Sequence, residues 1–404
     1  MKPQRSQPQK KGVKLLVSSF LFGLASLFNG LLPSMKNIVS LCSTPDFTDS
    51  AKAVFDYIAT SDIGKKLVLV WHVKQPGKVR AIYNDDGKRA CRVMFVKKNH
   101  FLSFIMFCLS RYIVDTHGLY SMVNMKNEQR SVYLTHGMPV KKFGFEYDND
   151  IKNGVQYADY SLATSIFYKS VIARSMGIPE TNVFPIGLPR NDVFFINDQK
   201  REQIDRLLSC RYVLYLPTYR VSDARNKSNG VDLSSGDKVF GGTIQEWEIL
   251  NMKLKDNGMK IVIKPHPLEM NNDLSSVKTY SQIVVIDDNW IIERKLSLNI
   301  IMKYSSGLIT DYSGAFVDYL LTDKPIAFFM PDYTEYSDSR GYVFESFDQM
   351  IPGEKVTCFS DIFDAIKADR YAEKRKKLRE KINTQQDETA SEQVCKILFD
   401  ELVD

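Results

Sequence analysis

Cysteine and histidine are scarce in this sequence of 404 residues, which has six of the first and five of the second. The cysteines are widely separated, with no C-x-x-C pair and no histidine at a spacing suited to a shared metal ion. This pattern excludes a disulfide framework and a structural zinc site, and it predicts reduced, mostly buried thiols typical of cytosolic proteins. A nominal DxD pair, Asp148 and Asp150, lies in a polar stretch that indicates a loop, so we expect no tightly bound metal ion.

Two phosphate-binding signatures are missing as well. Neither a P-loop nor a G-x-G-x-x-G fingerprint occurs, which argues against an ATPase or a nicotinamide enzyme. No basic cluster with interleaved aromatic residues matches a nucleic-acid module, so we expect no nucleic-acid partner. The net charge of +6 permits an anionic partner, such as a phosphate polymer or a lipid surface, without requiring one.

The first 36 residues differ in composition from the rest. Residues 1–14 carry five cationic side chains and no acidic one, and residues 15–35 are uncharged. No A-x-A-like cleavage site follows, so a removable signal peptide is not expected. Small residues recur at helical spacing and leave a wide Leu/Phe face, which favours a helix lying in the membrane interface on anionic lipid. A membrane span and a buried packing helix are the alternatives.

From residue 37 onward, short apolar runs alternate with longer helical ones, which predicts βαβ units and parallel sheets. The length exceeds what one hydrophobic core usually supports. The polar stretch 191–205 separates two such series, so we place a boundary near residue 195. The prediction is an N-terminal α/β domain over 37–195 and a C-terminal α/β domain over 196–404 that includes the terminal helices.

Three local patterns carry further predictions. The run "FLSFIMFCLSRYIVDT" (101–116) predicts a helix. The polar, Gly/Ser-rich stretch 220–242 predicts a mobile loop. The basic run "EKRKKLREK" (373–381) predicts a solvated helix face, with docking to an anionic lipid or polymer as the alternative.

Polar side chains follow several predicted strands at the point where each strand ends. In open parallel sheets, ligands bind outside the carboxyl ends of the strands. The segments are "SVYLTHG", "RYVLYLPTYR", "KIVIKPHP", in which two prolines end the strand, and "GLITDYSG". The polar residues that they deliver are His136, Arg220, Lys264, His266, Thr310 and Asp311.

The last of these segments predicts a phosphate site. A helix that begins at Ser313 and Gly314 exposes unpaired N–H groups, and glycine lets a ligand approach the backbone closely. Asp318 shares a face with Asp311 if that helix extends back far enough. With the cations at positions 220 and 264, this half is expected to clamp a diphosphate. The alternative is that Asp311 or Ser313 merely caps the helix.

Several segments occur in an order that resembles a known family. They are "YLTHGMPVKKFG", "GLPRND", "YLPTYR", "IKPHP" and "LITDYSGAFVDYLLTDKPIAFFMPDYTEY", with "RGYVFE" and "PG" after them. Together they resemble the CDP-glycerol glycerophosphotransferase family, which comprises teichoic acid primases and polymerases and related capsule enzymes. The family usually has tryptophan at the positions of Thr135 and Tyr219, and neither change removes an ionisable group.

The resemblance implies a fold and a reaction. The fold is GT-B-like α/β, with two Rossmann-like domains whose parallel sheets face a central cleft, the nucleotide in the C-terminal half and the acceptor at the N-terminal half. The reaction is a metal-independent transfer of a polyol phosphate, without a cofactor, from CDP-glycerol or CDP-ribitol to a hydroxyl, and CMP leaves. His136 is then the base, and Arg220, His266 and the helix end at Ser313 hold the leaving phosphate.

Other residues take smaller roles in this interpretation. Gly137, Lys141 and Lys142 are expected at the acceptor, although surface lysines commonly have no role. His72, His100 and His117 are interpreted as structural. The acceptor is expected to be lipid-linked or polymeric, and the protein to lie peripherally on the cytoplasmic face of the bacterial membrane through residues 15–35.

Two other functions stay open on the sequence. One is a GT-B glycosyltransferase that uses a CMP-sugar, because HP motifs occur in bacterial sialyltransferases and "NDDG" (84–87) is similar to their acidic motif. The same tetrapeptide is also typical of a hairpin turn. The other is a non-catalytic membrane assembly protein that keeps the fold. Assays with CDP-glycerol and CMP-sialic acid separate the first alternative, and binding of cytidine nucleotides tests the second.

Overall fold

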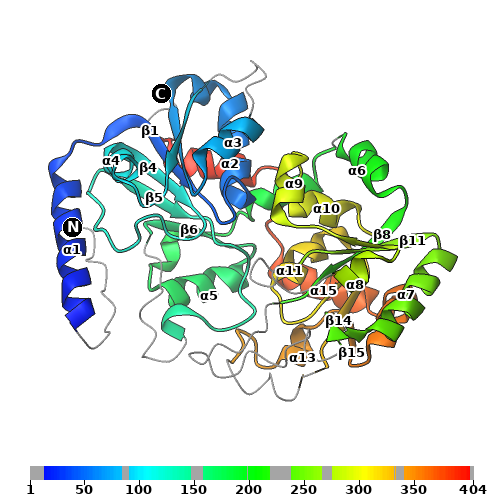
Figure 1. Ribbon diagram of the computed structural model, residues 1–404. Coiled ribbons are helices and arrows are strands. Elements are labelled where there is room, and N and C mark those ends of the chain that lie inside the picture. Colours follow the sequence, from blue (N-terminus) through cyan, green and yellow to red (C-terminus); the bar gives the residue numbers. More distant parts are fainter. Residues whose placement is uncertain are drawn as a thin grey trace. The chain divides into compact units, whose positions relative to one another are not determined.

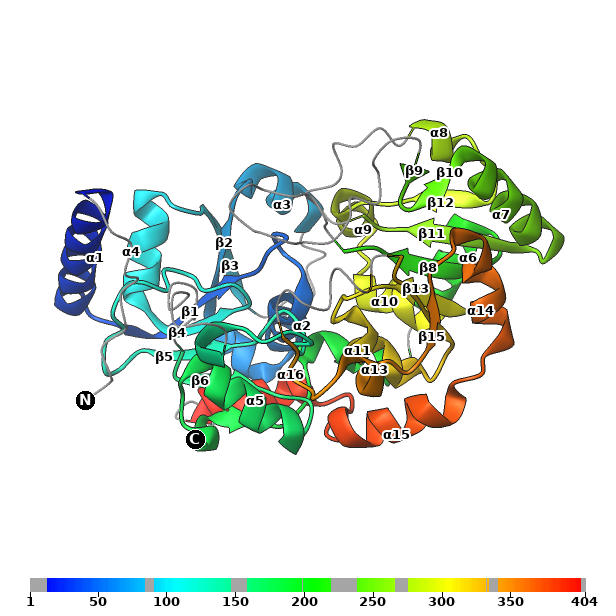
Figure 2. The same cartoon turned by 90° about the horizontal axis from the view of Figure 1, so that it is seen from below.

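The computed structural model describes residues 13–83, 91–146, 158–197, 199–218, 238–265, 275–331, 333 and 341–400, and their side chains from Phe20 onward except those of Ser275 and Ser276. The chain forms two compact units, each built on its own parallel sheet (Figure 1, Figure 2). Unit 1 comprises Met1–Met138, Phe143–Phe195 and Gln385–Asp404; unit 2 comprises Pro139–Lys142 and Ile196–Thr384. The units part after Phe195, close to where the polar stretch placed the boundary.

Two segments belong to the other unit than the sequence suggested. The C-terminal segment that begins at Gln385 belongs to unit 1, where the Asp192 carboxylate accepts hydrogen bonds from the backbone N–H of Ala390 and Ser391. Residues 139–142 belong to unit 2, because Lys141 forms an antiparallel bridge with Tyr342. Both assignments rest on contacts between residues far apart in the chain, which local patterns do not report.

Unit 1 is built on a seven-stranded sheet in the order β3-β2-β1-β4-β5-β6-β7, with every pair parallel. The strands are β1 (Met35–Cys42), β2 (Val68–Val73), β3 (Arg92–Lys97), β4 (Ser110–Asp115), β5 (Arg130–Tyr133), β6 (Tyr160–Leu162) and β7 (Val183–Phe184). The central strands are buried along most of their length, as expected for a parallel sheet covered on both faces. The strand order reverses between β1 and β4, the kind of position where doubly wound sheets bind ligands.

Helical segments precede, connect and follow these strands. They are the α-helices α1 (Val13–Leu31), α2 (Asp49–Thr60), α3 (Pro76–Tyr83), α4 (Phe101–Leu109), α5 (Ile166–Met176) and α16 (Ala390–Leu398), and the 3-10 helices η1 (Asp62–Lys66), η2 (Gly144–Glu146), η4 (Glu180–Asn182) and η5 (Pro189–Phe194). The helix predicted over 101–116 was wrong in its second half. Helix α4 ends at Leu109 and β4 begins at Ser110, so the run contains a helix and a buried central strand.

Helix α1 contacts the rest of unit 1 through a polar edge. Its Asn29 is fully buried and donates to the backbone of Asn124 and to the side chain of Gln129, while Phe28 stacks on Phe104 of α4. The opposite side exposes large apolar side chains. These are Phe20, Leu21, Leu24, Leu27 and Leu31. Within the described part of the chain, no helix combines the length and hydropathy needed to cross a membrane.

Unit 2 is built on a six-stranded parallel sheet in the order β12-β11-β8-β13-β14-β15. Its strands are β8 (Arg211–Leu216), β11 (Met259–Ile263), β12 (Ile283–Val285), β13 (Gly307–Thr310), β14 (Ile326–Phe329) and β15 (Glu354–Val356), and a two-stranded hairpin pairs β9 (Lys238–Val239) with β10 (Gly242–Thr243). Numbered within the unit, this is the 3-2-1-4-5-6 order of a dinucleotide-binding fold, which reverses between β8 and β13.

The helical segments of unit 2 cover this sheet. They are α6 (Lys200–Leu208), α7 (Ile244–Asp256), α8 (Ser275–Lys278), α9 (Asp288–Glu293), α10 (Leu298–Tyr304), α11 (Ala315–Tyr319), η7 (Leu320–Thr322), α13 (Phe347–Met350), η8 (Phe359–Asp361), α14 (Ile362–Ala368) and α15 (Ala372–Ile382). Helix α7 begins with a capping box between Thr243 and Glu246, and its Trp247 is fully buried against Phe359.

Two of the local predictions can be compared with unit 2. Of the predicted loop 220–242, residues 220–237 lie outside the described residues and the rest enters the β9–β10 hairpin. The basic run lies on α15, where most charged side chains are exposed, as predicted. Arg375 is buried and paired with Asp369.

Candidate functional site

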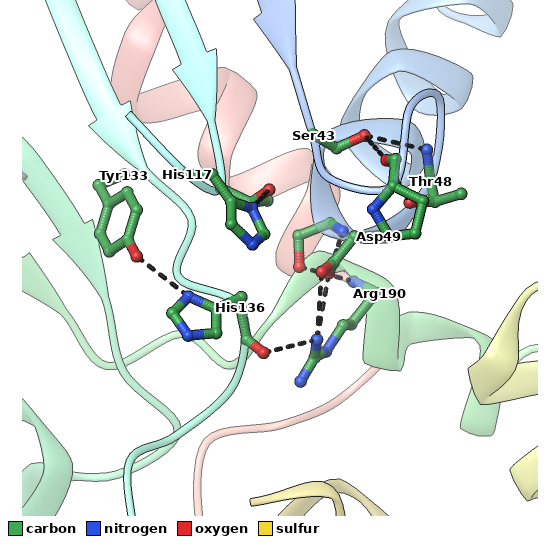
Figure 3. A network of polar contacts seen from close by, with 10 residues as sticks. Ser43, Thr48, Asp49, His117, Tyr133, His136 and Arg190 are labelled. Carbon is green, nitrogen blue, oxygen red and sulfur yellow. Dashed lines mark hydrogen bonds and ion pairs between the residues drawn. The ribbon is translucent and has the colours of Figure 1, made fainter. Parts of the chain in front are cut away.

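The turn after β5 presents His136 at the carboxyl edge of the first sheet (Figure 3). Thr135 has φ of 56° and Gly137 has φ of 132°, so the residues on both sides of the histidine have left-handed backbone conformations. A positive φ is rare for a β-branched residue, and such outliers gather at functional sites. The His136 side chain is exposed, and its Nδ1 lies 3.2 Å from the hydroxyl of Tyr133.

Arg190 fixes this turn from η5. Its Nη1 donates to the Asp49 carboxylate at 3.2 Å and to the backbone carbonyl of His136 at 3.1 Å. A Cβ atom at Gly137 would lie 2.8 Å from Arg190 Nη2, so only glycine leaves room for the guanidinium. Asp49 begins α2 with φ of 62°, a third unusual backbone conformation at the same edge. The glycine after the histidine therefore serves both the backbone conformation and the arginine contact.

His117 lies beside His136, although the sequence interpretation treated it as structural. It follows β4, the neighbour of β5, and the two imidazole rings stack with centroids 5.0 Å apart and planes 28° apart. The Thr116 hydroxyl lies 2.8 Å from His117 Nδ1. The site thus holds two adjacent imidazoles.

The surroundings keep both imidazoles neutral at pH 7. Protein atoms crowd around His136 and partly desolvate its ring, and this desolvation, followed by the charge of Arg190, lowers its pKa below the ordinary value of 6.5. Asp49 and a hydrogen bond to the Thr116 backbone oppose the shift. Burial, and next the proximity of His136, lowers the pKa of His117 to about 4. A neutral imidazole is the form that accepts a proton.

In unit 2, a hydrogen-bonded pair joins the two strands at the reversal point. The buried Asp311 carboxylate, just after β13, accepts from the Thr218 backbone N–H at 3.1 Å and from its hydroxyl at 2.8 Å, just after β8. The Thr310 hydroxyl donates to the carbonyl of Leu216 at 3.0 Å. These contacts fix the chain that leads from β8 toward Arg220, which itself lies outside the described residues.

The other predicted nucleotide-binding residues of unit 2 have mixed placements. Lys264 follows β11 and forms an ion pair with Asp288 at 2.9 Å. Helix α11 begins at Ala315 with Gly314 as its N-cap, and the Ser313 hydroxyl accepts from the Ala315 N–H at 3.2 Å. The helix therefore does not extend back to Asp311, so the condition under which Asp311 and Asp318 would share a helix face is not met. Asp318 is buried.

The two candidate acceptor lysines belong to unit 2 by their contacts. The Lys141 ammonium lies 5.8 Å from the ring centre of Tyr312, between Asp311 and Ser313 in sequence. The Lys142 backbone N–H donates to the carbonyl of Gly341, and its side chain is exposed. His266, the NDDG stretch and the Asp148/Asp150 pair lie outside the described residues.

Comparison with known protein families shows which family the chain belongs to. Residues 24–400 match the family model described as CDP-Glycerol:Poly(glycerophosphate) glycerophosphotransferase. The chain belongs to this family. The match covers nearly the whole of both units and confirms the resemblance seen in the quoted segments.

The curated relatives of this glycerophosphotransferase-family protein have names that assign them to teichoic acid synthesis. The teichoic acid ribitol-phosphate polymerase TarK of Staphylococcus aureus is 25% identical over 306 residues, which cover 71% of this chain and 56% of the relative. The match to the teichoic acid ribitol-phosphate polymerase TarL of the same organism covers 51% of that protein. The chain therefore spans about half the length of these two relatives. A teichoic acid glycerol-phosphate transferase of S. aureus is 22% identical over 428 residues, covering 96% of this chain and 99% of the relative.

Solved structures share the fold of this family member. The wall teichoic acid polymerase TagF aligns with a TM-score of 0.74 at 20% identity, covering 96% of this chain and 95% of that chain. A UDP-GlcNAc 2-epimerase from Neisseria meningitidis aligns with a TM-score of 0.53 at 11% identity, covering 90% and 100%. Together with the two parallel sheets, these likenesses confirm the predicted GT-B-like α/β class; the cleft between the sheets stays a prediction.

Sequence reasoning missed three residues of the unit 1 site of this glycerophosphotransferase-family protein. Arg190 was available in the quoted "GLPRND" segment, but its contact with Asp49 joins positions 141 residues apart. His117 was missed because "RYIVDT" was taken for the end of a helix. Residues 110–115 instead form strand β4, which pairs with β5. His117 and His136, which follow these two strands, therefore lie at the same edge of the sheet. Among the described residues, no group of three His, Cys, Asp or Glu side chains is arranged to hold a metal ion.

Proposed function

We propose that the protein transfers glycerol phosphate, or a related polyol phosphate, from a CDP-activated donor to an acceptor hydroxyl in teichoic acid or capsule synthesis and releases CMP. The observation that carries this proposal is His136, a neutral imidazole held at the sheet edge by Tyr133 and Arg190 in a chain of the glycerophosphotransferase family.

In this proposal His136 is the general base. The role requires the tautomer in which Nδ1 carries the proton and donates to the Tyr133 oxygen, so that Nε2 keeps its lone pair. Burial raises the pKa of Tyr133, and the phenol therefore stays neutral beside the ring. Nε2 takes the proton of the acceptor hydroxyl, the hydroxyl oxygen attacks the β-phosphorus in line, and the bond to the CMP oxygen breaks. Hydrogen-bond reach to that hydroxyl is the geometric requirement.

Unit 2 is proposed to bind the CDP-polyol at the edge where its strand order reverses. Its observed order supports this, since doubly wound sheets take nucleotides there. The proposed contacts are Lys264, Thr310, Asp311, Ser313, Gly314 and Asp318, with Arg220 and His266. Asp311 supports the site indirectly, because its hydrogen bonds to Thr218 fix the segment that delivers Arg220. The transfer is proposed to need no cofactor and no tightly bound metal ion.

The proposed acceptor is lipid-linked or polymeric, and Gly137, Lys141 and Lys142 are proposed to lie near it. The exposed Lys142 supports a contact with acceptor phosphates, whereas the Lys141 ammonium already lies near the Tyr312 ring. Glycerol and ribitol are both retained as the transferred polyol.

Residues 15–35 are proposed to hold the protein peripherally on the cytoplasmic face of the membrane. The exposed Leu/Phe side of α1 supports an interfacial position, because its polar edge, with Asn29 and Ser26, is already used by unit 1. The cations of residues 1–14 suit anionic lipid. A Leu24→Glu/Leu27→Glu double variant should lose co-sedimentation with vesicles of anionic and zwitterionic lipid, while Ile249→Glu, an exposed apolar position on α7 in unit 2, should keep it. Equal sedimentation of both variants would contradict this part.

The test of the transfer is CMP release from CDP-glycerol and CDP-ribitol, with and without membrane extract. Acceptor-dependent release from either donor supports the proposal. Release from CMP-sialic acid alone would replace the phosphotransferase with a glycosyltransferase. Binding of no cytidine nucleotide would favour a non-catalytic role for this fold.

A further inference from the structure

His117 has a defined geometry that the proposed mechanism does not use. The His117 ring stacks on the His136 ring with a centroid distance of 5.0 Å, and the Thr116 hydroxyl forms a hydrogen bond of 2.8 Å with His117 Nδ1. Thr116 is itself fully buried. His117 is therefore hydrogen-bonded to a fully buried neighbour and is itself partly buried, whereas the His136 side chain is exposed on a turn.

We infer that His117 is a positioning residue, whose ring holds the His136 ring in the orientation required of the base. The inference rests on the proposed function in that the base is the one proposed above. The torsion that turns an imidazole about its Cβ–Cγ bond is broad, so the orientation of the ring depends on all the contacts that the ring makes. Tyr133 contacts Nδ1, the Thr116 backbone also hydrogen-bonds the ring, and the face of His117 restricts the remaining rotation.

The charged groups around the pair fit this role. His136 faces His117 after β4, Tyr133 on β5, Asp49 on α2 and Arg190 on η5. The positive charge of Lys98, which follows β3, also acts on His117. Burial, followed by His136, Lys98 and Arg190, disfavours a proton on His117 and outweighs the opposing charge of Asp49, so His117 stacks as a neutral ring and adds no charge beside the base. It also keeps water from one face of His136.

Covering that face has a measurable consequence. Removing the His117 ring should readmit water to His136, weaken the desolvation, and raise the pKa of His136 toward 6.5. A flat apolar ring at the same position should keep both the orientation and the desolvation. His117→Ala and His117→Phe therefore form a matched pair that differs in the presence of a ring, and neither keeps a ring nitrogen.

The experiment is an NMR titration of the His136 ring in the full chain without substrate, followed by steady-state kinetics with CDP-glycerol. We expect His117→Ala to move the midpoint of His136 upward and to lower kcat by about tenfold to a hundredfold, the scale of a misplaced reacting group, with KM for CDP-glycerol little changed. His117→Phe should keep the wild-type midpoint and stay within a few-fold of the wild-type kcat. His100→Ala, at an exposed histidine of the same unit, should change neither.

Two results would overturn the inference. An unchanged His136 midpoint in His117→Ala would show that the ring does not shield the base. Equal loss of kcat in the Ala and Phe variants would assign the effect to a ring nitrogen of His117. Thr116→Val keeps the side-chain shape and removes the hydroxyl, and it should shift midpoint and kcat in the same direction as the Ala variant but less. Because the titration needs no substrate, failure of the proposed transfer would leave that arm of the test intact.

Discussion

Arg190 donates a hydrogen bond to the backbone carbonyl of His136 and an ion-paired hydrogen bond to Asp49, and thereby ties η5 and α2 to the turn after β5. The carbonyl belongs to the residue whose side chain is the proposed base. The position of the His136 backbone is consequently set by a contact between three segments of unit 1.

Gly137→Ala tests how tightly this turn is built. The new methyl group would meet Arg190 Nη2 at 2.8 Å on a backbone with φ of 132°. We expect a loss of about 1–3 kcal/mol in the free energy of unfolding, the usual cost of a strained backbone conformation. Thermal unfolding measures it. Gly77→Ala is the control, because a Cβ there meets nothing within 4 Å; equal losses in both variants would refute the crowding argument.

Asp49→Asn tests the electrostatics of the base. The Asp49 carboxylate raises the pKa of His136, so its removal should lower that pKa further and move the acidic limb of the pH profile of kcat/KM to lower pH. The charge of Arg190, left without this partner, acts in the same direction. Asp56→Asn, on the same helix and paired with Lys52, should leave the limb in place. A limb that moves upward in Asp49→Asn would contradict the assignment.

Asp311→Ala tests the support of the proposed nucleotide site. Loss of the two hydrogen bonds to Thr218 should loosen the end of β8, and we expect CMP to bind about tenfold more weakly, as when about 1.4 kcal/mol is lost. Titration calorimetry with CMP measures this. Asp205→Ala removes an exposed ion pair of α6 in the same unit and should bind CMP normally. Unchanged binding in Asp311→Ala would remove Asp311 from the site.

His72 gives a prediction for stability against pH. It is fully buried on β2 between Ser40 and Ser103, and burial lowers its pKa from 6.5 to about 3. Above pH 6.5 the ring is neutral in both folded and unfolded chains. Between pH 6.5 and about 3 only the unfolded chain takes up the proton, so the free energy of unfolding falls as the pH falls, by up to about 1.4 kcal/mol per pH unit.

Urea unfolding at a series of pH values separates this contribution. His72→Asn should be less stable than the wild type at pH 7, because the hydrogen bonds to Ser40 and Ser103 are altered, and should show a shallower loss of stability toward acid. His100→Asn, at an exposed position, should retain the wild-type slope. Parallel slopes for wild type and His72→Asn would contradict the buried neutral ring.

The sequence predicted the sheet edges better than the contacts across them. Apolar runs such as "RYVLYLP" and "SVYLTH" end in turn-forming residues, so the placement of Thr310 at the end of a strand and of Asp311 and His136 after strands followed from local pattern. The pairing of Thr218 with Asp311 and of Asp49 with Arg190 depends on strand order and on the path of η5, which no local pattern encodes.

The His117 error had a different cause. No glycine or proline separates α4 from β4, so "FLSFIMFCLSRYIVDT" has no visible boundary between helix and strand. The C-terminal segment was assigned to the wrong unit for a related reason. Helix α16 is amphipathic, and such an apolar face suits either unit. The hydrogen bond from the Ala390 N–H, at the start of α16, to the Asp192 carboxylate joins it to unit 1. Tertiary packing decided both cases.

The role of His136 as the base is tested by the rate of CMP release from CDP-glycerol, with membrane extract as the source of acceptor, for wild type and His136→Ala. We expect acceptor-dependent release by the wild type and a loss of about a hundredfold to ten-thousandfold in the variant, the range of general-base catalysis, with CMP binding retained. Acceptor-dependent release that persists at the wild-type rate in His136→Ala would show that His136 is not the base.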